Sequence, residues 1–105
     1  MDFENFTAFE TPEDGLEEYL ENFLHKRRED LSEMKSWYKN NDMENVKKIL
    51  HKWEGFAEPY GFGGLRVFSG QIRASIQLQK PELFEKICTQ VQAYLLYKER
   101  TLLER

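Results

Sequence analysis

The sequence predicts an all-α protein, an up-down-up-down antiparallel four-helix bundle with a short N-terminal arm or helix over one end. Apolar residues recur at three- and four-residue steps, the period of one helix face, in four successive segments. Most prolines and glycines fall between these segments, and no segment shows the alternation of a strand. Because short loops join the segments, each apolar stripe is most simply buried against its neighbours.

The first long helix is expected to begin at Pro12 and to continue to about Lys39. Thr11 can cap free amide groups, and proline suits the first helical position. Gly15 is a mild weak point near this start. The apolar positions of this helix are Leu16, Leu20, Phe23, Leu24, Leu31, Met34 and Tyr38.

The next three helices follow from the same reasoning. Asp42 can cap a second helix, which Pro59 and Gly61 should end between Ala57 and Gly61. A third helix follows, and Pro81 opens the fourth. The apolar positions are Val46, Ile49, Leu50, Trp53 and Ala57, then Leu65, Phe68, Ser69, Ile72 and Ile76, then Leu83, Phe84, Ile87, Val91, Tyr94, Leu95 and Leu102.

A chain of 105 residues favours a single domain with one core. We divide it into an N-terminal arm, residues 1–11, and a bundle domain, residues 12–105. Phe3, Phe6 and Phe9 are three residues apart in the arm. This spacing favours an apolar lid over one end of the core, and a docking surface is the alternative.

Composition narrows the partners and the compartment. Fifteen Lys and Arg against nineteen Asp and Glu give a net charge of −4, which favours neither nucleic acid nor anionic lipid as a partner. No apolar stretch approaches the roughly 20 residues of a membrane helix. A lone cysteine, Cys88, and an N-terminus without the pattern of a signal peptide indicate the cytoplasm.

Three further features have ordinary structural interpretations. Cys88 is expected to be a small buried apolar residue and not a nucleophile. It matches no metal-ligand spacing with the two histidines, His25 and His51, so no metal site is expected. The basic run from His25 to Arg28 is interpreted as a solvent-exposed face, with partner recognition as the alternative. The acidic residues that balance it are Glu17, Glu18, Glu21, Glu29 and Asp30.

His51 stands out among the polar residues. At 100° per residue it falls nearly opposite the apolar face of the second helix, so its side chain should be exposed in mid-helix. Lys47 and Lys48 lie one turn before it, Gly55 one turn after it and Glu58 two turns after it. A glycine inside a helix costs on the order of 1 kcal/mol relative to alanine, so Gly55 indicates close approach by another molecule.

The run His51-Lys52-Trp53-Glu54-Gly55, with Gly61 ten residues after the histidine and Leu65 fourteen after it, resembles the histidine-containing phosphotransfer (HPt) domain family. The resemblance covers about residues 12 to 100. It implies that His51 carries a phosphoryl group between receiver-domain aspartates in a two-component phosphorelay. The chain would then be a phosphoryl carrier and not a self-contained enzyme.

The resemblance also implies partners and cofactors. The expected partners are response-regulator receiver domains and a hybrid histidine kinase, and the chain itself is expected to be a monomer. It needs no cofactor of its own, since Mg²⁺ belongs to the receiver, and phosphoryl transfer depends mainly on positioning and charge neutralisation. The residues expected to face the partner are Lys47, Lys48, Lys52, Glu54, Gly55 and Glu58.

Two departures from the family pattern leave an alternative open. The family usually has a lysine three residues after the histidine, where this chain has Glu54, a negative charge near the phosphoryl position. The segment after the glycine, Phe56 to Tyr60, is bulkier than usual. The alternative is a pseudo-HPt or helical adaptor module that binds a receiver or another partner without being phosphorylated. An unrelated helical interaction module and a self-contained hydrolase are more distant alternatives.

Overall fold

Helices are the only regular secondary structure in the part of the chain that the computed structural model describes, residues 3–8 and 10–103. The prediction of an all-α protein is therefore confirmed for these residues. None of their helices is both long and apolar enough to cross a membrane. In chain order the elements are α1 (Phe3–Phe6), the 3-10 helix η1 (Glu17–Tyr19), α2 (Leu20–Lys39), α3 (Met43–Phe56), α4 (Gly64–Gln77) and α5 (Pro81–Leu103).

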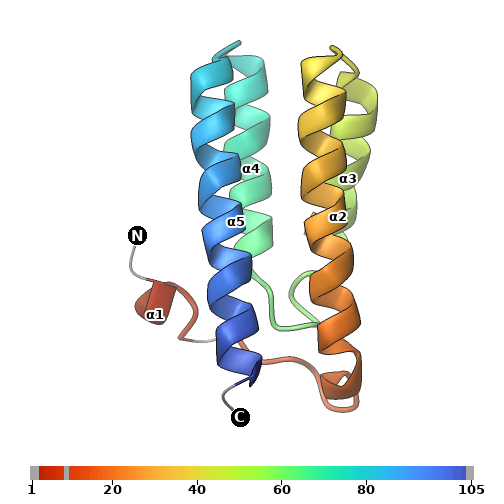
Figure 1. Ribbon diagram of the computed structural model, residues 1–105, viewed down its shortest axis with the longest axis vertical. Helices are drawn as coiled ribbons and strands as arrows, with labels where there is room; N and C mark the ends of the chain where they lie inside the picture. The colour runs from red at the N-terminus through yellow and green to blue at the C-terminus, as the bar shows by residue number, and fades with distance from the viewer. Residues whose placement is uncertain (1–2, 9, 104–105) are drawn as a thin grey trace.

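Four long helices, α2 to α5, lie side by side along the long axis of the molecule (Figure 1). α2 packs against α3 and α5, and α4 packs against the same two helices. Each helix therefore turns its apolar stripe toward a shared core, where burial from water stabilises the fold. The largest side chains that are fully buried there are Trp53, Tyr94, Phe62, Phe68 and Phe84.

Local signals set most of the helix ends. The Asp42 carboxylate accepts a hydrogen bond from the backbone N–H of Asn45 at 3.3 Å, so the predicted cap of α3 is confirmed. α3 ends at Phe56 with Ala57 as its C-cap, at the edge of the predicted interval. Pro81 is the first residue of α5, as the sequence predicts.

The predicted start of the first long helix at Pro12 is wrong. Gly15 has a φ of +90°, a left-handed conformation that interrupts a helix, and α2 begins only at Leu20 after η1. The backbone N–H of Glu13 donates to the carbonyl oxygen of Pro59 at 2.7 Å. The segment before Gly15 thus satisfies its backbone against the loop that follows α3, a long-range contact that no local capping signal reveals.

The N-terminal arm covers one end of the core. The ring of Phe6 lies 5.6 Å from that of Phe68 and 5.8 Å from that of Tyr94, and the ring of Phe3 lies 6.1 Å from that of Tyr94. Both arm residues are half-buried, which agrees with an apolar lid. Phe9, the third aromatic residue of the predicted lid, lies outside the described residues.

A carboxylate fastens this arm to α4 and α5. Glu10 accepts hydrogen bonds from the backbone N–H of Gly64 at 2.7 Å, from Lys98 Nζ at 3.0 Å and from the Tyr94 hydroxyl. Burial and the neighbouring carboxylate raise the pKa of Tyr94, so this hydroxyl stays protonated and donates. The arm is therefore joined to the helices by polar bonds as well as by ring contacts.

A buried polar cluster joins α2 to α3. The Asp30 carboxylate accepts hydrogen bonds from Trp53 Nε1 at 3.0 Å and from Lys52 Nζ at 3.2 Å. Arg27 Nε lies 2.9 Å from Asp30 Oδ2 without meeting the geometry of a hydrogen bond, so charge attraction dominates that contact. We call Arg27, Asp30, Lys52 and Trp53 the Asp30 cluster.

The Asp30 cluster corrects the prediction of a fully solvated basic face. Arg27 and Asp30 are only 5% and 6% exposed, so that interpretation is wrong for both. Burial lowers the pKa of Arg27 from its ordinary value, while the charge of Asp30 opposes this shift. Its guanidinium lies over the rings of Phe23 and Phe56, 4.6 Å from each ring centre. The exposed part of the face is His25, Lys26, Arg28 and Glu29, as predicted.

Replacing Asp30 tests the contribution of this cluster. Asp30→Ala would leave the Arg27 charge buried without its counter-charge and the Trp53 N–H buried without its acceptor, so the free energy of unfolding should fall by about 3 kcal/mol. Urea denaturation followed by circular dichroism measures the change. The control is Glu29→Ala, which removes an exposed partner of His25 and should change stability by no more than about 0.5 kcal/mol. Equal effects of the two variants would contradict the assignment.

Candidate functional site

His51 lies on the outer side of α3 and is exposed, so the prediction of an exposed mid-helix histidine is confirmed. The residues that follow it explain this orientation. Trp53 is completely buried, and Lys52 and Trp53 both donate to Asp30 of α2. Because adjacent helical residues are 100° apart, these two anchors fix the rotation of α3 and leave the imidazole facing solvent.

The three lysines near His51 have different environments. Lys47 and Lys48 are exposed, as expected for residues that would face a partner. Lys48 Nζ lies 4.0 Å from Glu44 Oε1, a surface contact of little energetic value. Lys52 instead turns toward α2 and forms its ion pair with Asp30. The structure thus separates Lys52 from the group of residues predicted to face a partner beside His51.

Glu54 is paired with an arginine from the next helix. Arg73 of α4 donates through Nη2 to Glu54 Oε1 at 2.6 Å, and its Nε lies 3.2 and 3.3 Å from the two carboxylate oxygens. This two-point hydrogen bonding is the main reason why the pKa of Glu54 is lowered, with weaker contributions from the charges of Arg73, His51 and Arg66. The negative charge that departs from the HPt pattern is therefore matched by a positive charge from α4.

A second pair of the same kind follows along the helices. Arg66 Nη1 of α4 lies 3.3 Å from Glu58 Oε1, and both side chains are exposed. Glu58 itself comes after the end of α3. The sequence analysis missed both arginines, although a signal was present. Arg66 and Arg73 are seven residues apart and therefore lie on one face of α4.

Gly55 has no packing reason to be glycine. A Cβ atom added there would meet nothing within 4 Å, and its backbone φ is not in the left-handed region. Gly61 shows the opposite case, because its φ is +81° and an added Cβ would lie 2.7 Å from the backbone nitrogen of Pro12. Gly70 in the middle of α4 is as open as Gly55. Both helices therefore present bare backbone to solvent.

Cys88 and His25 are the other side chains whose chemistry could suit a nucleophile or a metal ligand. Cys88 is 1% exposed, and burial raises its pKa to about 12, so it is a thiol at neutral pH, in agreement with the prediction of a buried apolar residue. His25 Nε2 lies 2.7 Å from Glu29 Oε1 on the surface of α2. Within the described ranges no three His, Cys, Asp or Glu side chains form a group that could hold a metal ion.

The openness of Gly55 leads to a stability test. Gly55→Ala should raise the free energy of unfolding by about 0.5–1 kcal/mol, because alanine restricts the unfolded chain and meets no obstacle in the helix. Gly61→Ala, the control, should lower it by about 1 kcal/mol or more through its left-handed φ and its contact with Pro12. Chemical denaturation measures both, and a destabilising Gly55→Ala would show that the fold requires this glycine.

The pairing of Glu54 leads to a titration test. Arg73→Ala should raise the pKa of Glu54 toward its ordinary value, since the main cause of the lowered pKa is removed. A lowered carboxylate pKa also means that the pair stabilises the fold at neutral pH and loses this effect as the pH falls through that pKa. Carboxyl-detected NMR titration measures the shift. Arg66→Ala is the control and should change it less, and the reverse order would refute the assignment.

No family model matches the chain, and no curated protein or solved structure matches it either.

Proposed function

We propose that this chain is a histidine phosphotransfer protein of a two-component phosphorelay, carrying a phosphoryl group on His51 between the aspartates of receiver domains. The main support is the combination of an exposed imidazole in the middle of α3 with an open backbone at Gly55, one turn further on. A receiver must bring its aspartate within bonding distance of the imidazole, and a helix surface without a side chain beside it permits that approach.

The proposal includes a finer description of the fold. We propose that α2 to α5 form the up-down-up-down antiparallel four-helix bundle of an HPt-like domain. This arrangement is supported by the packing of α2 and α4 against the same two helices, and by the short connections between successive helices. In such a bundle a residue opposite the core stripe of one helix is open to a protein partner along several turns.

The chemistry requires little from the carrier. A neutral ring nitrogen of His51 attacks the phosphorus of the aspartyl phosphate, a nitrogen–phosphorus bond forms, and the oxygen–phosphorus bond to the aspartate breaks. The aspartate leaves as a carboxylate. The phosphorylated ring is positively charged at first, and it becomes neutral when its other nitrogen releases a proton to solvent. Transfer to the next receiver reverses these steps. Mg²⁺ is expected on the receiver, and no cofactor is proposed for this chain.

Charge around His51 favours this chemistry more than the sequence alone indicates. A phosphoryl group on the imidazole brings close to two negative charges, and a carboxylate about 6 Å away would oppose each by roughly 0.7 kcal/mol in water. The guanidinium of Arg73 lies 2.6 Å from the Glu54 carboxylate and offsets its negative charge. Lys47 and Lys48 add positive charge one turn before His51. These cations reduce the obstacle that Glu54 presents.

The partners follow from the same chemistry. We propose response-regulator receiver domains and a hybrid histidine kinase as partners, with the chain acting as a cytoplasmic monomer. Its net charge of −4 gives no reason to add nucleic acid or a membrane to these partners. The chain is proposed to be a carrier, since the catalytic groups for transfer are expected on the receiver.

Phosphorylation with a small-molecule donor tests the proposal. Phosphoramidate phosphorylates reactive histidines directly, so incubation should add one acid-labile phosphoryl group to the wild-type chain, detected by intact-mass analysis. His51→Ala should lose the adduct. His25→Ala is the matched control, because it removes the other histidine of the sequence from a similarly exposed helix surface, and it should keep the adduct.

The outcomes separate the proposed carrier from its alternative. An adduct that persists in His51→Ala, or is lost only in His25→Ala, would refute the assignment of His51. A folded wild-type chain without any adduct would favour the pseudo-HPt or adaptor module, which binds a partner without being phosphorylated.

A further inference from the structure

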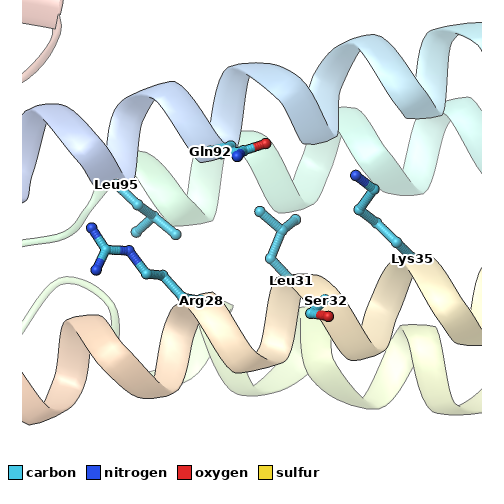
Figure 2. A pocket seen from close by; sticks show the side chains of 6 residues that line it. All are labelled: Arg28, Leu31, Ser32, Lys35, Gln92 and Leu95. Carbon is cyan, nitrogen blue, oxygen red and sulfur yellow. The ribbon is translucent and has the colours of Figure 1, made fainter.

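A cleft of about 330 Å³ lies between α2 and α5, on a different pair of helices from the His51 site. The phosphorelay proposal does not use it. Figure 2 shows that Arg28, Leu31 and Lys35 extend from α2 toward α5 and that Leu95 extends from α5 toward α2. The lining residues are Arg28, Leu31, Ser32 and Lys35 of α2, with Gln92 and Leu95 of α5.

The floor of this cleft is apolar, and a cationic side chain lies at each end. Leu31 and Leu95, one from each helix, lie between the two cationic side chains. Arg28 forms an ion pair with Glu99 of α5, which neutralises the charge at that end. Lys35 is seven residues further along α2, or about 10 Å along the helix axis. The cleft is thus a short apolar trough with a neutralised charge at one end.

The other end carries an unneutralised cation. Lys35 is half-buried and has no ion pair with any carboxylate of the described residues. Lys35 is one of the residues that line the cleft. Ser32 and Gln92 add hydrogen-bonding groups to the lining. In a chain of net charge −4, Lys35 is a local positive charge that none of the described carboxylates neutralises.

We propose that this cleft binds a small organic anion with an apolar body, and specifically a free medium-chain carboxylate. Its carboxylate binds Lys35 with help from Ser32 and Gln92, and its alkyl chain covers Leu31 and Leu95 toward the Arg28–Glu99 pair. Clefts of this volume, with an apolar lining and a few polar groups that fix orientation, are typical of small-molecule sites. Burial of the alkyl chain supplies affinity, and the charged hydrogen bond supplies selectivity for an anion.

Titration with decanoate tests this site on the full chain. Below its critical micelle concentration, decanoate should give saturable shifts of backbone amide NMR signals confined to residues 28–35 and 88–99. Lys35→Gln should weaken decanoate binding about tenfold by removing the charged partner. Lys47→Gln removes an exposed lysine of α3 and is the matched control, with binding unchanged. Decanol, which has the same chain and no charge, should bind the wild type about tenfold more weakly.

Each other result overturns the proposal. Shifts that do not saturate, or that spread over all helices, would mean nonspecific contact with the chain. Equal binding by the wild type and Lys35→Gln, or by decanoate and decanol, would mean that the cleft does not select an anion. None of these readouts involves His51, so they are independent of whether the chain carries a phosphoryl group.

Discussion

The orientation of the whole site depends on one buried carboxylate, Asp30. A carboxylate in a core is tolerated only if its charge and its lone pairs are satisfied. Here two consecutive residues of α3, Lys52 and Trp53, supply hydrogen-bond donors, and Arg27 of the same helix as Asp30 supplies a second positive charge. Only one rotation of α3 about its axis brings both donors to α2. That rotation places His51 outside, so the exposure of the histidine is a consequence of a buried charge.

The two flanks of α3 differ in the way charge is used. Toward α2, Arg27 and Asp30 are buried, Lys52 is partly exposed, and together with Trp53 they hold the helix in place. Toward α4, they are partly or fully exposed, and Arg73 and Arg66 neutralise Glu54 and Glu58. The face between these flanks keeps His51, the bare backbone of Gly55 and the nearby lysines. A carrier of a transferable anion needs such a face, on which local carboxylates are already paired and the backbone is accessible.

Sequence patterns predicted what depends on one helix at a time. The periodic apolar residues located the four long helices, Asp42 and Pro81 located two of their starts, and the helical wheel placed His51 outside. The errors and omissions involve contacts with other helices and loops, which a helical wheel of one segment does not represent. The segment at Pro12 bonds to the loop after α3, Arg27 and Asp30 are buried because Trp53 lies opposite them, and Arg73 reaches Glu54 only through the register of α3 and α4. The phosphoryl-carrying role of His51 stays a prediction.

The contacts of Glu10 have a consequence for the order in which the molecule assembles during synthesis. The arm is made early, whereas its hydrogen-bond partners are Gly64, Tyr94 and Lys98, which are made 54 to 88 residues later. α2 and α3 can pair as soon as both have left the ribosome, because few residues separate them. The arm can complete these contacts only after α5 has been made. In a nascent chain Phe3 and Phe6 therefore lack their contacts with Tyr94 until α5 emerges, and this end of the core closes only after that.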